Sequence, residues 1–256
     1  MSKKFMAVAV AIALVAAFLI YNSDAMKERR IINALVAQNI EARGGAGVWQ
    51  AVDTLRLTGQ MDLGQGMHVP YVMEQKRPGK MCLEFVFDEK TAVQCVDGKT
   101  GWKLLPFRGR NKPEAMTDQE YSEMVGGVEI DGLLFNAVER GNKVKLAGKE
   151  VVAGRSAARL EVTSPGGAVR WIYIDEETGL DLKLETTRVI SGKERRVETF
   201  YYDWQETDGL LIPRRQETRT QGDDEFHFVT VDSVLTNAPI DDSRFAMPAT
   251  AGGGSS

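Results

Sequence analysis

The sequence TLRLTGQMDL, residues 54–63, alternates between apolar and polar side chains. The apolar positions are Leu55, Leu57, Met61 and Leu63, and the polar positions between them are Arg56, Thr58, Gln60 and Asp62. Successive side chains of a β-strand point to opposite faces of a sheet. This period of two therefore predicts a strand with one buried and one solvated face.

Runs of the same kind recur along the chain, and turn-forming residues separate them. They are MHVPYVMEQK, KMCLEFVFD, TAVQCV, GWKLL, KVKLAG, SAARLEVT, AVRWIYID, LDLKLETTRVI, RVETFYYDWQE, LIPRRQETRT and DEFHFVTVDSVL. Short connections such as Asp97-Gly98-Lys99 predict antiparallel pairing in a meander. A sheet of this many strands curls or closes, so we predict a mainly β (α+β) fold, a strongly curved antiparallel half-barrel of about 11 strands.

Two segments have helical rather than strand periodicity. Residues 27–43, KERRIINALVAQNIEAR, carry an amphipathic pattern that ends at Gly44-Gly45, and a brief helical turn with Trp49 is expected to follow. Residues 117–139 begin with TDQE, a capping box, and continue an apolar stripe through Leu133, Leu134 and Val138. We predict that both segments cover the concave face as a lid, with the glycines at 126, 127 and 132 and the irregular basic loop 107–113 as hinges.

The N-terminus has the pattern of an export signal. Lys3 and Lys4 precede an apolar run of 17 residues, 5–21, and small residues lead to a cleavage point after Ala25. The alternative is an uncleaved inner-membrane anchor, because such a run is at the lower limit for spanning a bilayer. No cysteine stands directly after the run, which excludes lipid attachment to a cysteine at the new N-terminus. We expect residues 1–25 to be the signal, 26–248 a single periplasmic domain, and 249–256 a disordered tail.

Composition narrows the set of partners. Cleavage of the 256-residue chain after Ala25 leaves 231 residues, and the loss of Lys3, Lys4 and Asp24 moves the net charge from -4 to -5. No block of six or more basic residues occurs. Nucleic acid is therefore not expected as a partner.

The two cysteines, Cys82 and Cys95, both lie in the run MCLEFVFDEKTAVQC, residues 81–95. A hairpin that turns at Asp88 and Glu89 places them opposite each other on one face of the sheet. An oxidising compartment favours a disulfide there, and two free, packed thiols are the alternative.

The sequence contains little material for catalysis. Its two histidines, His68 and His227, are far apart in strands, and no nucleophile elbow, zinc-binding helix, phosphate loop or dinucleotide fingerprint occurs in a fitting context. We expect no metal, no cofactor and no enzymatic activity.

Large apolar side chains stand at alternate positions in several predicted strands. They are Leu83, Phe85, Phe87, Trp102, Leu104, Trp171, Tyr173, Phe200, Tyr202, Trp204, Phe226 and Phe228. If they share one face, they form either an ordinary core beneath the two helical segments or the wall of a cavity for an apolar ligand. The pattern alone leaves both readings open.

Several phrases of the sequence resemble bacterial outer-membrane lipoprotein-sorting-type proteins, in the superfamily of the periplasmic lipoprotein carrier and its outer-membrane receptor. They are IEARGGAGVWQAVDTLRLTGQM, VDGKTGWKLLPF, LAGKEVVAGRSAARLEVT, WIYIDEETGLDLKLE, YYDWQETDGLLIPRRQE and NAPIDDSRFAMP. The resemblance implies an incomplete barrel with a helical lid and an apolar cavity for acyl chains. Proteins of the same fold also serve as envelope-stress regulators. This chain lacks the acylated cysteine that anchors the outer-membrane receptor, so the resemblance favours a carrier or a sensor over a receptor.

These features support two functional hypotheses. The first is a periplasmic carrier of lipid or lipoprotein acyl chains in lipoprotein sorting or lipid transport, with an inner- or outer-membrane protein as a further partner. The alternative is an envelope-stress sensor or interaction platform on the same fold, tethered to the inner membrane.

Overall fold

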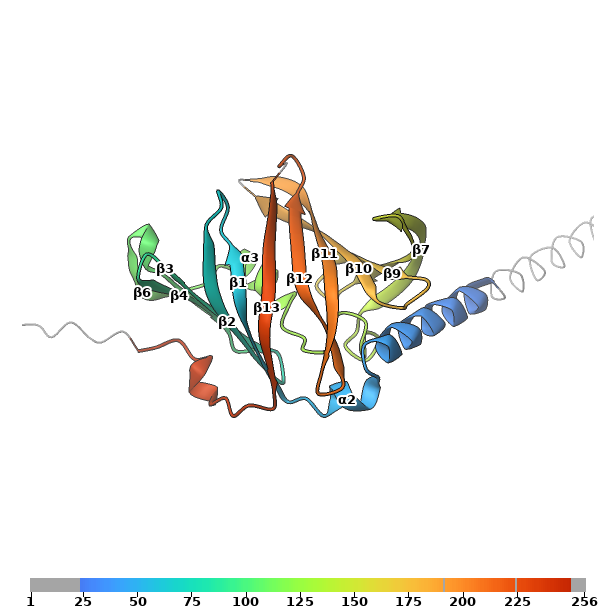
Figure 1. The fold of residues 1–256 in the computed structure, drawn as a ribbon, viewed down its shortest axis with the longest axis horizontal. Helices are drawn as coiled ribbons and strands as arrows, with labels where there is room; N and C mark the ends of the chain where they lie inside the picture. The colour runs from blue at the N-terminus through green and yellow to red at the C-terminus, as the bar shows by residue number, and fades with distance from the viewer. Residues whose placement is uncertain (1–23, 191, 224, 250–256) are drawn as a thin grey trace, which may run out of the picture.

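A computed structural model describes residues 24–190, 192–223 and 225–249 (Figure 1). Almost all of the predicted signal or anchor (residues 1–25) and of the predicted tail (249–256) lies outside these ranges. Within them, every helix is too short or too polar to cross a lipid bilayer.

The described residues form one antiparallel sheet of thirteen strands. The strands are β1 (Thr54–Asp62), β2 (His68–Lys76), β3 (Lys80–Phe87), β4 (Lys90–Val96), β5 (Gly101–Leu105), β6 (Arg110–Ala115), β7 (Lys143–Val152), β8 (Arg155–Thr163), β9 (Val169–Asp175), β10 (Asp181–Ile190), β11 (Lys193–Thr207), β12 (Leu210–Thr220) and β13 (Phe226–Thr236). Their order is β6-β5-β4-β3-β2-β1-β13-β12-β11-β10-β9-β8-β7, so the sheet is an open meander whose halves join where β1 pairs with β13. The mainly β, antiparallel fold is confirmed, with thirteen strands rather than about 11.

The unpredicted strand is β6, where we expected an irregular basic loop. Pro106–Arg108 forms a single 3-10 turn, and Gly109 has φ 73°, which lets the chain reverse sharply. The next residues then return along β5, with Lys103 opposite Glu114. Pro113 has no N–H to donate, and it is tolerated because β6 is an edge strand, one side of which has no neighbouring strand to bond.

We call the side of the sheet that carries Leu55 and Leu57 the inner face, and its reverse the outer face. In β1 the predicted alternation is confirmed, because Leu55, Leu57, Met61 and Leu63 all belong to the same inner cluster. Gly59 is a point of close approach: a Cβ there would lie 1.9 Å from the carbonyl oxygen of Thr230, at the β-bulge with β13.

The N-terminal helix, helical over residues 24–42, covers the inner face of β8 and β9. Ile32, Leu35 and Val36 pack on a cluster that includes Leu160 and Ile172. Its end is fixed by Gly44, whose φ is 113° and where a Cβ would lie 2.1 Å from the Gly209 carbonyl oxygen. A short helix, α2 (Ala46–Gln50), follows, and Trp49 within it is 3% exposed. Both elements agree with the prediction.

The second predicted helical segment, residues 117–139, is only partly helical. Helix α3 (Asp118–Val125) begins with the predicted capping box between Thr117 and Glu120. Residues 126–142, here called the connector, form turns, because Gly132 and Asn136 adopt positive φ values of 86° and 49° that a helix does not allow. Leu134 is 1% exposed beneath the N-terminal helix with Leu133 beside it, whereas Val138 is 68% exposed, so no continuous apolar stripe exists.

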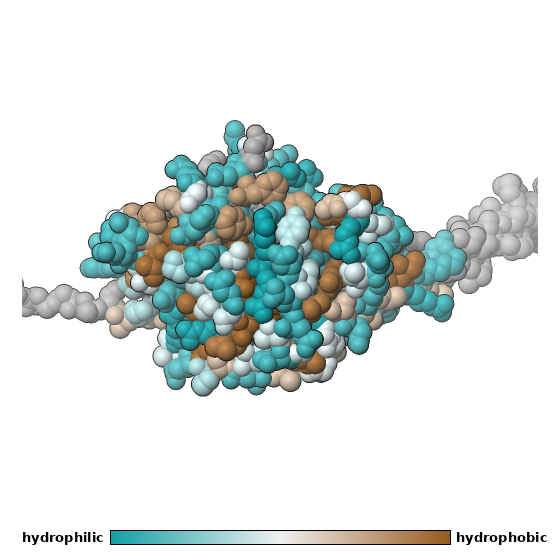
Figure 2. Space-filling model, viewed as in Figure 1, coloured by the Kyte–Doolittle hydropathy of each residue, from teal (hydrophilic) through white to brown (hydrophobic). Residues whose placement is uncertain are grey.

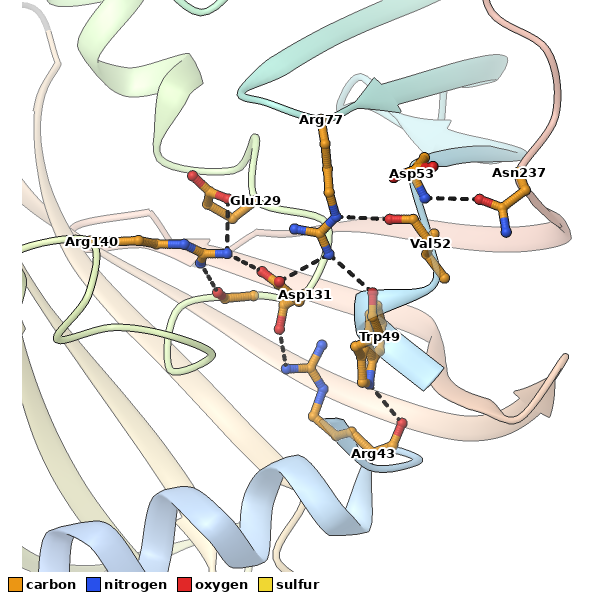
Figure 3. A network of polar contacts seen from close by, with 10 residues as sticks. Arg43, Trp49, Val52, Asp53, Arg77, Glu129, Asp131, Arg140 and Asn237 are labelled. Atoms are coloured by element: carbon orange, nitrogen blue, oxygen red, sulfur yellow. Dashed lines mark hydrogen bonds and ion pairs between the residues drawn. The ribbon is translucent and has the colours of Figure 1, made fainter. Parts of the chain in front are cut away.

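A polar network fastens the connector to the rest of the molecule (Figure 3). Asp131 is 1% exposed, and its two carboxylate oxygens lie 2.9 Å from Arg77 Nη2 and 2.5 Å from Arg140 Nη2. Arg43 Nη1 donates to the Asp131 carbonyl oxygen at 3.0 Å, and Arg140 also reaches Glu129 at 3.1 Å. The connector is therefore held by this charge cluster as well as by buried apolar side chains such as Ile130, Leu134 and Phe135.

The outer face of β3 and β4 is closed by a C-terminal strap, residues 237–247. Cys82 and Cys95 pair in register and are joined by a disulfide with a Cα–Cα distance of 4.1 Å. Asp88 and Glu89, at the turn between the two strands, both have positive φ, as a type I′ hairpin requires. Phe245 of the strap, 1% exposed, packs on the disulfide.

Candidate ligand cavity

The twelve apolar residues predicted to share one face lie on both. Leu83, Phe85 and Phe87 of β3 belong to the inner cluster that includes Leu55. Trp102 and Leu104 of β5 instead pack on the outer face, with the disulfide and the strap. The prediction that these apolar side chains share one face of the sheet is therefore wrong for β5.

The aromatic residues of β9 to β13 also lie mainly on the outer face. Trp171, Tyr173 and Phe200 pack together, whereas Ile172 and Ile174, which alternate with the first two, face the N-terminal helix. The register of the sheet puts Tyr202, Phe226 and Phe228 on the same face as Phe200. Trp204 lies beyond Asp203, a residue with φ 55° where pairing with β12 is interrupted, and its ring centroid is 6.3 Å from that of Tyr201.

These outer aromatic rings cover charged groups. Lys183 Nζ lies 4.0 Å from the centroid of the Tyr173 ring and 2.9 Å from a carboxylate oxygen of Glu198, and Arg159 stacks over Trp171 and Tyr173. In the view of Figure 1, β12 and β13 lie in front of α3, and the same view in Figure 2 shows hydrophilic and hydrophobic residues intermixed. Ile172, Ile174 and Leu184 thus take inner positions in β9 and β10, and the outer aromatic rings shield ion pairs.

A cavity of ≈ 860 Å³ lies between α3 and the inner face. Its lining includes Leu83 and Gln94 of β3 and β4 on one side, and Leu184 and Tyr201 of β10 and β11 on the other. In a flat sheet β3 and β10 would be about 29 Å apart, because five strands separate them. Their presence in one cavity shows that the sheet curves strongly around it.

The sequence predicts an apolar cavity, whereas the wall of this cavity is amphipathic. Met81, Leu83, Met124 and Leu184 give it an apolar part. The polar part consists of Gln94, Glu120, Ser122, Glu123, Arg170, Thr186, Thr187, Arg188, Glu194, Thr199, Tyr201 and Gln216. Of the twelve predicted ligand-binding residues, Leu83 lines the cavity from the inner face, and Trp171 borders it although its ring packs on the outer face. Their role in binding stays a prediction.

Beyond Tyr201 lies a group of buried polar residues below the N-terminal helix. Asn39 Nδ2 donates to Asp181 Oδ1 at 2.7 Å. Burial raises the pKa of Asp181, although the charge of Arg43 and the hydrogen bond from Asn39 oppose this shift. Burial, and then the charge of Asp181, raises the pKa of the Tyr201 hydroxyl.

Helix α3 covers the cavity through a few contacts. Tyr121, Met124 and Val125 pack on a cluster with Met81 and Val96, yet α3 has no fully buried residue. Glu120 forms an ion pair with Lys103 of β5. The hydrogen bond from Lys103 is the main cause that lowers the pKa of Glu120.

Two amide side chains complete the attachment of this cover. Gln119 Nε2, on α3, donates to the Val189 carbonyl oxygen of β10 at 3.0 Å. Gln75 Nε2, on β2, donates to the Gly127 carbonyl oxygen at 2.8 Å. Because α3 bridges strands from the two halves of the sheet, its displacement would open the cavity between them.

Sequence reasoning missed the arginines of the cavity, although the sequence holds a signal for them. Arg170 is separated by an even number of residues from Ile172 and Ile174, and Arg188 likewise from Leu184, so alternation puts each arginine on the same face as these inner residues. A charged residue at a position that alternation assigns to the inner face indicates a polar site there.

No group of three or more metal-ligating side chains occurs within the described ranges. His68 stacks on Phe228, with ring centroids 4.8 Å apart, and His227 Nδ1 lies 3.8 Å from an Asp62 carboxylate oxygen. Neither histidine lines the cavity. The geometry of the cavity suits binding through apolar, hydrogen-bonding and charged contacts.

No protein-family model and no curated protein sequence matches this chain. Solved structures do. A LolA superfamily protein from Nitrosomonas europaea superposes with a TM-score of 0.56 at 13% identity, over 82% of this chain and 96% of that one. A putative outer membrane lipoprotein-sorting protein domain from Vibrio parahaemolyticus gives 0.55 at 12%, over 82% and 94%.

A DUF1329 family protein from Desulfovibrio piger gives a TM-score of 0.54 at 12% identity, over 84% of this chain and 97% of that one. Identities this low establish the fold alone. The resemblance inferred from the sequence is thus confirmed for the fold, which this chain shares with a LolA superfamily protein and an outer-membrane lipoprotein-sorting domain.

Proposed function

We propose that this chain is an exported periplasmic binding protein that holds an acyl chain of a lipid or lipoprotein beneath α3. Its role would lie in outer-membrane lipoprotein sorting or lipid transport, with a membrane protein that loads or unloads it. The observation that carries the proposal is the cavity of ≈ 860 Å³ on the concave side of a lipoprotein-sorting-type fold. Its volume falls in the range of about 300–1,000 Å³ typical of small-molecule sites.

The apolar part of the wall supplies the driving force. Met81 and Leu83 of β3 face the cavity from one half of the sheet, Leu184 of β10 from the other, and Met124 from the cover. Burial of each methylene of an acyl chain contributes about 0.8 kcal/mol, so a partly covered chain of ten carbons gains several kcal/mol. Methionine side chains adapt to chains of different length, which suits a carrier.

Displacement of a fluorescent fatty acid tests the proposal, together with native mass spectrometry of protein isolated from its own envelope. The substitution Thr199→Trp fills the cavity from β11, and we expect it to weaken probe binding at least about tenfold. Ser233→Trp adds the same side chain at an exposed position of β13 and is the matched control. The absence of both co-purified lipid and probe binding in the unmodified protein would contradict the proposal.

The exported state needs a separate test, because the residues that decide it lie outside the described ranges. Determination of the mature N-terminus distinguishes the two states. A start at Met26 supports a diffusible periplasmic carrier, whereas retention of residues 5–21 supports a tethered protein.

A further inference from the structure

Two arginines distinguish one wall of the cavity. Arg170 of β9 and Arg188 of β10 both line it. In the register of the sheet Arg170 pairs with Thr186, so Arg188 is its diagonal neighbour on the same face. Diagonal neighbours in an antiparallel pair are about 7 to 8 Å apart, within reach of a shared ligand for side chains of this length.

Neither arginine has a carboxylate partner in the part of the chain that the structure describes. By contrast, Arg77, Arg140 and Arg219 each reach a carboxylate oxygen within 3 Å. The cavity wall also includes Glu123 and Glu194, but neither forms an ion pair with the two arginines, and Glu120 is paired with Lys103. Two guanidinium groups without counter-charge thus face the same space.

The surroundings of Arg170 make an unpaired charge unfavourable. The residue is half-buried, and desolvation followed by repulsion from Arg188 lowers the pKa of its guanidinium. A Cβ placed on Gly126, at the end of α3, would lie 2.4 Å from Arg170 Nη2, so the guanidinium lies directly against the cover. An anion bound between the two arginines would relieve both effects.

The order of residues along β10 separates the charged and apolar parts of the wall. Arg188 is exposed near the turn to β11, and Leu184 is four residues further into the sheet, about 13 Å along the strand. Leu184 faces the same cavity as Leu83 of β3. A ligand with a charged group at one end and an apolar chain at the other matches this arrangement.

We propose that Arg170 and Arg188 bind the anionic headgroup, phosphate or carboxylate, of an acyl lipid whose chain occupies the apolar part of the cavity. This inference rests on the proposed function and specifies its ligand class. Arginine suits the role because its planar guanidinium can donate two parallel hydrogen bonds to such a group.

Three probes test the inference: palmitoyl lysophosphatidate, the palmitoyl monoacylglycerol without phosphate, and glycerol phosphate without an acyl chain. We expect the unmodified protein to bind lysophosphatidate at least about tenfold more tightly than the monoacylglycerol. Arg170→Gln should remove most of that preference and Arg188→Gln part of it, while monoacylglycerol binding stays unchanged. Arg196→Gln, at an exposed β11 position outside the cavity wall, is the matched control and should change nothing.

A second variant tests the same site without removing a charge. Gly126 has an ordinary helical φ of -60°, so Gly126→Ala is compatible with the backbone but displaces the Arg170 guanidinium. It should weaken lysophosphatidate binding more than monoacylglycerol binding.

The outcomes separate this inference from the proposed function. Failure of both lipids to bind would contradict the function itself. Equal affinity for the two lipids, unchanged in the arginine variants, would overturn the headgroup site and leave the carrier intact. Binding of glycerol phosphate as tightly as lysophosphatidate would overturn the acyl lipid as the source of the anion.

Discussion

The inner face has two covers, and they are built differently. The N-terminal helix lies on buried aliphatic residues and is pinned by Asn39, which is completely buried and bonds both Asp181 and the Gly179 carbonyl oxygen. Helix α3 has eight residues, none fully buried, and is held over the cavity by three polar contacts and one small apolar cluster. The comparison indicates that the first cover is a fixed wall and that the second is the part able to move.

The largest expected effect comes from breaking the network that fixes the connector between the two covers. Asp131→Asn leaves Arg77 and Arg140 without their buried counter-charge, and we expect unfolding in urea to show a loss of about 3 kcal/mol. The matched change in the mobile cover, Glu120→Gln, removes a half-exposed partner of Lys103 and should cost about 1 kcal/mol or less. Equal losses would mean that the connector and α3 are equally fixed.

Amide hydrogen exchange compares the covers without any substitution. Residues 118–125 of α3 should exchange at least about tenfold faster than residues 30–42 of the N-terminal helix after correction for intrinsic rates, because α3 can open locally. Exchange of both helices at one common rate would argue for a single cooperative unit.

A smaller effect concerns the ion pair at the start of α3. Glu120 has a lowered pKa in the folded protein, chiefly through Lys103, so its stabilising contribution is present above its ordinary pKa and is lost as the pH falls through the lowered value. Lys103→Met should raise the pKa of Glu120 in a carboxyl NMR titration. A titration curve that does not move would show that Lys103 does not hold the cover.

The smallest expected effect tests the strap of the outer face as a third cover. Lys76 and Lys80 hold the pKa of Asp242 at about 2, so this contact is fully present above the ordinary carboxyl pKa and is lost as the pH falls through about 2. At pH 5, Asp242→Asn should therefore speed reduction of the Cys82–Cys95 disulfide by a phosphine. Well below pH 2 the variant and the unmodified protein should react at similar rates, and a difference that persists there would contradict the role of this charge.

Local rules explain which features of the fold could be predicted from the sequence. The alternation in β1, the opposition of Cys82 and Cys95, the stop at Gly44 and the capping box at Thr117 each depend on residues close together in the chain. β6 was missed because Pro113 and Gly109 suggest a loop, and only its position at the edge of the sheet makes a strand with proline acceptable.

The site was harder to predict because alternation gives two faces without saying which is inside. In β9 the aromatic side chains of Trp171 and Tyr173 point to the outer face, where they cover Lys183 and Arg159. Which set of alternate side chains faces inward depends on ion pairs between strands and on β-bulges. These arise only when the sheet is assembled. The cavity follows from curvature that brings β3 near β10, a relation that neither strand encodes alone.

The central claim is that α3 covers a ligand cavity, and hydrogen exchange with and without palmitoyl lysophosphatidate tests it most directly. Bound lipid should slow exchange in residues 118–125 and in the inward-facing parts of β10, with little change in residues 24–42. Saturating lipid that binds yet leaves the exchange of α3 unchanged would place the ligand elsewhere and contradict the account.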